Sequence, residues 1–127
     1  MKDSYFFKHD SNARHDPKIQ ILISEYGLEG YGRYWVIIEM LREATCYKLE
    51  TKDYVWSALA LELKATVSAV KKFVSDCIDK YELLTRDEGF FYSEALLARM
   101  VKLEEIRSKR QRAAEIRWID KELNSPL

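Results

Sequence analysis

Apolar and polar positions along this chain follow two different repeats. Five segments have apolar residues that recur three and four positions apart, the spacing of one helix face. We expect helices over residues 17–26, 30–44, 52–62 and 67–80, and a long last helix from residue 94 onward. The segment between the fourth and fifth helices has the pattern of a β-hairpin instead. The chain is therefore expected to be mainly helical.

The expected helix ends carry residues that cap backbone groups. Asp16, Thr51, Thr66 and Ser93 each precede a helical stripe, and their side chains can accept hydrogen bonds from the first turn. Pro17 suits the first helical position after Asp16. Gly27 is a plausible C-cap, since glycine adopts the left-handed conformation easily.

The hairpin pattern occupies residues 81–92. The apolar runs Leu83-Leu84 and Phe90-Phe91-Tyr92 flank the polar loop 87–89, and Gly89 can take the positive φ that a three-residue loop needs. Two strands alone are marginal in water, so the hairpin must pack on the helices. Residues 47–49 are a candidate third strand.

Helices that end in one small hairpin are typical of a winged helix-turn-helix. The predicted fold is thus a mainly α winged helix-turn-helix domain over residues 1–106. Residues 107–127 extend the last helix, first as a basic segment, then as an amphipathic one, with a loose tail at 124–127. The aromatic run at 5–7 could be a strand or a docked arm.

Composition and charge narrow the class of protein. The 127 residues are 47% apolar, enough for a core, and 21 basic residues balance 21 acidic ones. A net charge of zero argues against a histone-like binder but permits a local basic face. We find no signal peptide and no run long enough to span a membrane. Cys46 and Cys77 are isolated, which favours buried thiols in a reducing cytoplasm.

The second helix of a helix-turn-helix enters the major groove, and here that is the segment 67–80. Its outward positions and the preceding turn carry cations and hydroxyls that could hold phosphates or base edges. These candidate DNA-binding residues are Lys64, Ser68, Lys71, Lys72 and Ser75. The alternative is an ordinary solvated helix face, and Asp76 and Asp79 on it would repel DNA.

Two further sites could contact a phosphate backbone. Arg86 lies at the hairpin tip beside two acidic residues. The last helix carries five cations against one anion, Glu115, in its most basic stretch. These cations are Arg107, Lys109, Arg110, Arg112 and Arg117. The alternative is a solvated helix whose charges pair with Glu104 and Glu105 at helical spacing.

The end of the last helix carries apolar side chains that a single helix cannot cover. The predicted oligomer interface consists of Ile116, Trp118, Ile119 and Leu123. Pairing with a second copy is favoured over a membrane role, because nothing else in the chain indicates lipid contact. A homodimer is therefore expected.

Catalytic chemistry has little support. His9, Asp10, His15 and Asp16 could suggest a metal site, but capping and turn roles fit this irregular segment better. The glycines at 27, 30 and 32 have the wrong spacing for a dinucleotide loop. We expect no enzyme activity, no metal and no cofactor.

The motif H-D-S-N-A-R-H-D-P-K-I at 9–19, followed by G-L-E-G-Y-G-R-Y-W at 27–35, resembles a known family. It is similar to the amino-terminal domain of phage replisome-organiser and DnaD-like replication proteins. The resemblance covers roughly residues 4–100 and is most specific in its first third. It implies a winged-helix module, often preceding a second DnaD-type domain, and supplies no catalytic residues.

The resemblance implies DNA binding in replication of a phage or mobile element, with low sequence specificity. The partner would be duplex DNA, with single-stranded DNA also open. One alternative is a protein-interaction module for self-assembly or for docking a helicase or loader of the replisome. Another is a transcriptional regulator.

Overall fold

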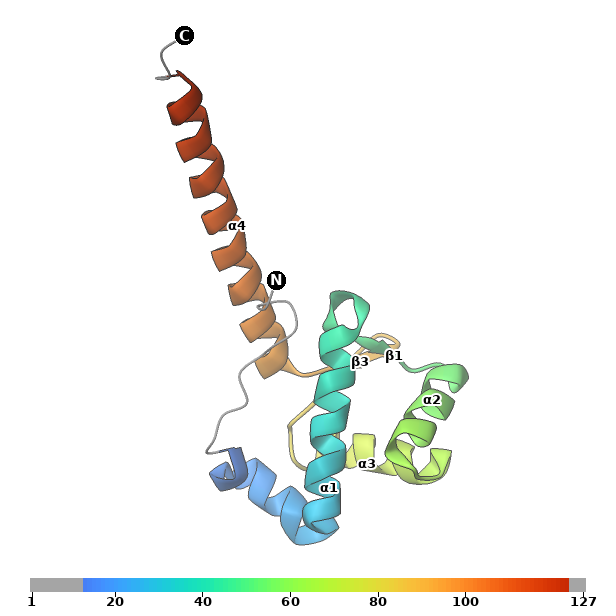
Figure 1. Cartoon of the computed structure of the whole chain (residues 1–127). Coiled ribbons are helices and arrows are strands. Elements are labelled where there is room, and N and C mark those ends of the chain that lie inside the picture. Colours follow the sequence, from blue (N-terminus) through green and yellow to red (C-terminus); the bar gives the residue numbers. More distant parts are fainter. Residues whose placement is uncertain (1–12, 124–127) are drawn as a thin grey trace. The chain divides into compact units, whose positions relative to one another are not determined.

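The computed structural model describes residues 13–123 of the chain (Figure 1). They form four α-helices: α1 (Pro17–Glu43), α2 (Asp53–Leu63), α3 (Val67–Asp79) and α4 (Glu94–Leu123). Two short 3-10 turns, η2 (Ala13–His15) and η3 (Thr45–Tyr47), flank α1. Three short strands are β1 (Leu49–Glu50), β2 (Thr85–Asp87) and β3 (Phe90–Tyr92). The predicted fold class, mainly α with a small sheet and a long last helix, is confirmed.

The described residues divide into two compact units. One unit ends at Leu97 and holds α1, α2, α3 and the sheet. The other begins at Ala98 and consists of the remainder of α4. The predicted aromatic arm at 5–7, the turn role of Asp10, and the loose tail at 124–127 lie outside the described residues.

Helix α1 is two helical segments joined at a kink. Its N-cap is Asp16, as predicted, whose carboxylate accepts a hydrogen bond from the Lys18 backbone N–H at 2.8 Å. At Gly27 the backbone leaves the helical region with φ 72° and ψ −171°. The break predicted at Gly27 is thus present, but the second segment starts at once. Gly30 lets the turns pack closely, because an added Cβ would lie 2.3 Å from that of Tyr26.

Helices α2 and α3 form the helix-turn-helix pair. Lys64 ends α2 in the left-handed conformation, and the Ala65 N–H donates to the carbonyl of Ala60 at 3.0 Å. Thr66 caps α3 as predicted, with its hydroxyl accepting from the Ala69 N–H at 3.1 Å. This short turn leads the chain directly from the end of α2 into α3.

The predicted capping role of Thr51 is wrong. The N-cap of α2 is Lys52, which makes no side-chain capping bond. The Thr51 N–H donates instead to the carbonyl of Gly89 at 2.8 Å, which continues the pairing beyond β1. Because the sheet holds Thr51 in an extended position, α2 begins only at Asp53.

The hairpin is present with shorter strands than predicted. The sheet is antiparallel with the order β1-β3-β2, so the third strand predicted near residues 47–49 is real but displaced to 49–50. Glu88 and Gly89, both with positive φ, make the turn between Asp87 and Phe90. Leu83 and Leu84 lie outside β2, because their N–H groups both donate to the carbonyl of Cys77.

The core of the first unit joins α1, α2, α3 and the hairpin. The rings of Trp56 in α2 and Phe91 in β3 stack with centroids 5.6 Å apart, which packs the wing against the helix-turn-helix. Within α3 the buried residues are Val70, Phe73, Val74 and Cys77. Val67, which helical spacing from Val70 and Val74 would place on the same face, is 36% exposed. The buried stripe is instead centred nearer to Phe73.

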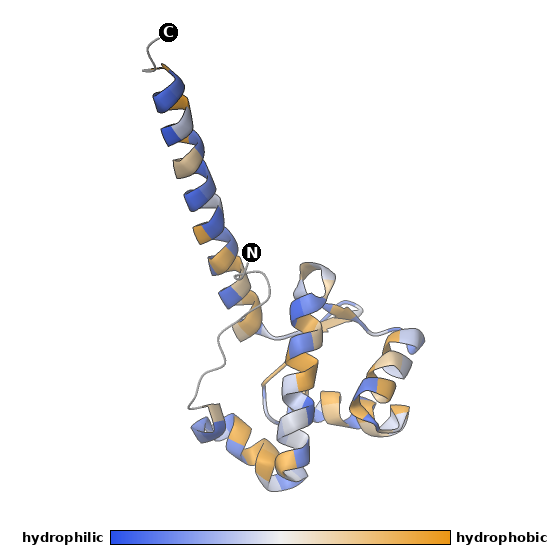
Figure 2. Cartoon of the chain, viewed as in Figure 1, coloured by the Kyte–Doolittle hydropathy of each residue, from blue (hydrophilic) through white to orange (hydrophobic). Residues whose placement is uncertain are grey.

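Ser93 starts α4, as the capping pattern predicted. Its buried hydroxyl accepts a hydrogen bond from the Leu96 N–H at 3.2 Å. Figure 2 shows that the later part of α4 is mostly hydrophilic, with isolated apolar positions.

Candidate nucleic-acid interface

The outer face of α3 holds four of the predicted DNA-binding residues, and Lys64 lies in the turn before it. At about 100° per residue, Ser68, Lys71 and Ser75 lie on one side of the helix, with Lys72 next to them. Lys64, Ser68, Lys71 and Lys72 are exposed, whereas Ser75 is half-buried. The structure thus brings the cations and hydroxyls of this helix to one solvent-facing surface.

Lys71, unlike Lys72, forms no ion pair with a carboxylate of the described residues. Its ammonium lies 6.0 Å from the ring centroid of Trp56, a cation–π arrangement. Within residues 13–123, neither Lys71 nor Lys64 has a carboxylate at ion-pair distance. Both charges can therefore meet an external anion without first breaking an ion pair.

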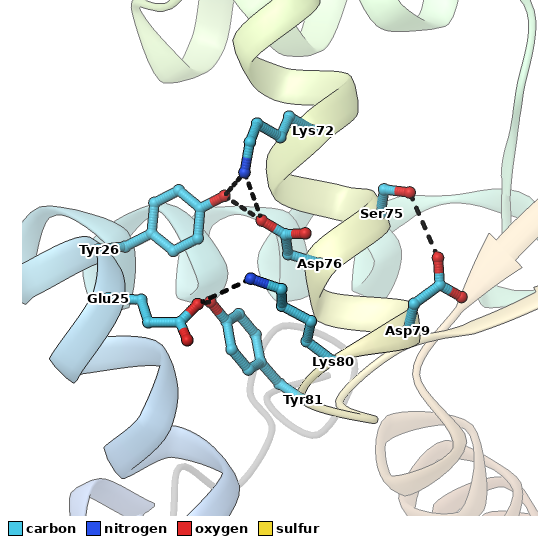
Figure 3. A network of polar contacts seen from close by, with 8 residues as sticks. All are labelled: Glu25, Tyr26, Lys72, Ser75, Asp76, Asp79, Lys80 and Tyr81. Carbon is cyan, nitrogen blue, oxygen red and sulfur yellow. Dashed lines mark hydrogen bonds and ion pairs between the residues drawn. The ribbon is translucent and has the colours of Figure 1, made fainter.

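Lys72 belongs to an internal network, which Figure 3 shows. Its ammonium lies 3.0 Å from the carboxylate of Asp76 and 3.5 Å from the Tyr26 hydroxyl. The Tyr26 hydroxyl also donates a short hydrogen bond to Asp76. Lys72 therefore joins α3 to the kink of α1, and a phosphate would have to compete with Asp76 for it.

The electrostatics of this network favour the charged forms of Asp76 and Lys72. Burial disfavours the carboxylate of Asp76, but the hydrogen bonds from Tyr26 and Lys72 outweigh it, so the pKa of Asp76 is lowered. The same hydrogen bond to Asp76 raises the pKa of Lys72. The expected repulsion of DNA by Asp76 is consequently offset by a cation that it holds in place.

A second pair of contacts ties the residue before Tyr26 to the end of α3. The Tyr81 hydroxyl donates a short hydrogen bond to the Glu25 carboxylate, and Lys80 lies 3.4 Å from the same oxygen (Figure 3). The hydrogen bond from Tyr81 is the main reason that the pKa of Glu25 is lowered. Sequence reasoning missed Glu25, Tyr26 and Tyr81, because partners more than 45 residues apart leave no local pattern.

The wing presents more negative than positive charge. Arg86 lies 3.9 Å from the carboxylate of Asp79, so this predicted phosphate contact is turned toward an acidic group of α3. At the turn, Asp87 pairs with Lys48 at 3.1 Å, and Glu88 is exposed. These charges make the wing a poorer phosphate contact than the face of α3.

The basic residues predicted on the last helix all lie in α4. Arg107 is half-buried, and Lys109, Arg110, Arg112 and Arg117 are exposed. The predicted oligomer interface is also solvent-accessible, with Ile116 63%, Trp118 62%, Ile119 52% and Leu123 78% exposed. Both sets belong to the second unit, whereas the face of α3 belongs to the first.

Other kinds of site find little support in the part of the chain that the structure describes. No three His, Cys, Asp or Glu side chains within residues 13–123 are grouped to hold a metal ion. Over the same residues, no helix combines the length and apolar character needed to cross a bilayer. Cys77 is buried as predicted, which raises the pKa of its thiol to about 12, but the predicted burial of Cys46 is wrong because that residue is exposed.

Comparison with known proteins identifies a family whose model fits this chain. The model, described as Lin1244/Lin1753-like, N-terminal, matches residues 6–96, which is more than two thirds of the chain. The matched segment contains α1, α2, α3 and the sheet, together with the start of α4. No curated protein and no solved structure matches the chain.

Proposed function

This chain belongs to the Lin1244/Lin1753-like N-terminal family, and from that premise we propose that it is a DNA-binding module. The outer face of α3 would contact duplex DNA, as the second helix of a helix-turn-helix does. The observation that carries this proposal is the exposed pair of cations, Lys64 and Lys71, neither of which is neutralised by a carboxylate within the described residues.

Specificity for a base sequence would be low. The face of α3 offers lysines and serines, which suit phosphate oxygens. Helix α3 contains no arginine, asparagine or glutamine, the side chains that read guanine and adenine edges with paired hydrogen bonds. Affinity would therefore come chiefly from charge and would fall with added salt.

The biological role we propose is replication of a phage or mobile element. Support comes from the motifs at 9–19 and 27–35, which are similar to those of replisome-organiser and DnaD-like proteins. The role is binding rather than catalysis.

A second copy of the chain would complete the module. Ile116, Ile119 and Leu123 recur at spacings of three and four residues in α4 and are each more than half exposed. That spacing forms a narrow apolar seam of the kind that pairs two helices. A symmetric dimer would carry two copies of the α3 face.

Binding of a labelled duplex at two salt concentrations tests the main proposal. We compare the wild type with Lys71→Glu, Lys72→Glu and the double variant, and use Lys18→Glu in α1 as a control with the same change of net charge. Lys71→Glu should weaken duplex binding. It should also reduce by about 1 the slope of the logarithm of the binding constant against the logarithm of the salt concentration. Lys72→Glu should also lower stability, because Asp76 loses its partner.

The proposal is contradicted if the wild type does not bind duplex DNA at low salt. The winged helix would then serve protein contacts, such as docking of a helicase or loader. A footprint confined to one short operator would instead indicate a transcriptional regulator.

A further inference from the structure

Trp118 lies on a different side of α4 from the apolar seam. At about 100° per residue, its side chain is about 160° around the helix from Ile116 and about 140° from Leu123. A partner helix seated on Ile116 and Leu123 would therefore leave Trp118 in water. Its 62% exposure is therefore not accounted for by the dimer seam.

A row of cations runs beside Trp118. Arg107, Arg110, Arg117 and Lys121 fall within about 80° of the helix circumference, and Trp118 lies at the edge of that row. From the first to the last of these residues the helix rises about 21 Å. A row of this length can follow the phosphates of an extended nucleic-acid strand.

The other side of Trp118 is acidic. Glu115 and Glu122 precede and follow it by one helical turn, on the side away from the cations. A phosphate would be repelled there, but a neutral base would not. The arrangement therefore suits a strand whose backbone lies on the cations and whose base lies over the indole.

We propose that this face of α4 binds single-stranded nucleic acid, with its phosphates along Arg107, Arg110, Arg117 and Lys121 and one base stacked on Trp118. Aromatic stacking combined with cations on the backbone is how proteins hold single strands without reading sequence. A duplex keeps its base faces inside the stack and cannot use Trp118 in this way. This second site extends the proposed nucleic-acid function beyond α3.

A membrane surface fits this helix less well. Interfacial helices gather their apolar residues on one face, with cations bordering it. Here Trp118 and the seam at Ile116 and Leu123 lie on opposite sides, and the acidic Glu115 and Glu122 border the tryptophan. Anionic lipid would meet these carboxylates wherever the indole entered the headgroup region.

Titration of the full chain with oligo(dT), and in parallel oligo(U), longer than the about 4–16 nucleotides of typical single-strand sites tests this proposal. Binding should quench the tryptophan emission, and Trp118→Ala should lose the quench and bind about 5- to 150-fold more weakly. Trp118→Phe should keep most of the affinity, because a ring remains. Leu28→Ala in α1 is the control, since it truncates another exposed apolar side chain that belongs neither to a proposed binding site nor to the dimer seam.

Unchanged oligonucleotide affinity in a Trp118→Ala variant with wild-type circular dichroism overturns the proposal. The proposal is also overturned if anionic vesicles shift the tryptophan emission to shorter wavelength while no oligonucleotide binds. Lys71→Glu separates this site from the α3 face, because it should weaken duplex binding and leave the oligo(dT) quench intact. If the wild type binds oligo(dT) through Trp118 but binds no duplex, only the function proposed for α3 fails.

Discussion

At the scale of single residues, the kink of α1 depends on a backbone conformation that is nearly exclusive to glycine. Gly27 has φ 72° and ψ −171°, a region where a Cβ is strained even with no atom within 4 Å of it. Gly27→Ala should therefore lower the free energy of unfolding by about 1–3 kcal/mol, as measured by urea denaturation.

Gly32 is the matched control for that substitution. A methyl group at this position would likewise meet no atom within 4 Å, but the backbone there is helical, with no positive φ. Gly32→Ala should stabilise the protein by up to about 1 kcal/mol. Equal effects at the two positions would show that the conformation of Gly27 is not the reason for its presence.

Asp76 should make stability depend on pH. Its pKa is lowered in the folded state, so its contribution is present above the ordinary carboxylate pKa and is lost as pH falls through the folded value. Unfolding free energy should thus decline below about pH 4. Urea denaturation across that range should show a shallower decline in Asp76→Asn.

Glu62→Gln, at an exposed position of α2, serves as the comparison for Asp76→Asn. It should keep the pH dependence of the wild type. A decline in Asp76→Asn as steep as that of the wild type would mean that the network of Tyr26, Lys72 and Asp76 does not couple protonation to folding.

At the scale of elements, two threonines with the same local pattern have different roles. Thr66 accepts a hydrogen bond from the first turn of α3, whereas Thr51 makes no cap for α2. Thr66→Ala should therefore cost about 1 kcal/mol of unfolding free energy. Thr51→Ala should stay within about 0.5 kcal/mol of the wild type, because its backbone bond to Gly89 remains.

Chemical denaturation of the two variants checks this prediction. A larger loss in Thr51→Ala than in Thr66→Ala would contradict the assignment of the caps. It would indicate that the Thr51 side chain, and not only its N–H, holds the end of β1 against the hairpin.

At the scale of the whole molecule, self-association should depend on one side of α4 only. Ile116→Asp or Ile119→Asp places a charge in the proposed seam and should shift a dimer to monomer by light scattering. Trp118→Ser, on the other side of the helix, should leave the dimer intact. A wild-type chain that stays monomeric at high concentration would rule out strong pairing through this seam.

The sequence by itself determined the features that depend on neighbouring residues. Asp16, Thr66 and Ser93 act as caps, Gly27 breaks α1 and Gly89 turns the hairpin, because each requirement concerns the backbone within a few positions. Helical periodicity likewise indicated the fold class and placed Ser68, Lys71 and Lys72 on the outside of α3.

Only the tertiary structure decided which of those exposed side chains form ion pairs and hydrogen bonds within the protein. Lys72 forms an ion pair with Asp76 and a hydrogen bond with the hydroxyl of Tyr26, which lies 46 positions earlier in the chain. Lys71 is exposed and makes a cation–π contact with Trp56. The burial of Phe73 in place of Val67 arose in the same way. The physical reason is that the helical repeat of 3.6 residues per turn indicates only approximately which side of a helix is buried. The side that finally faces the core depends on packing against side chains from segments far away in the sequence.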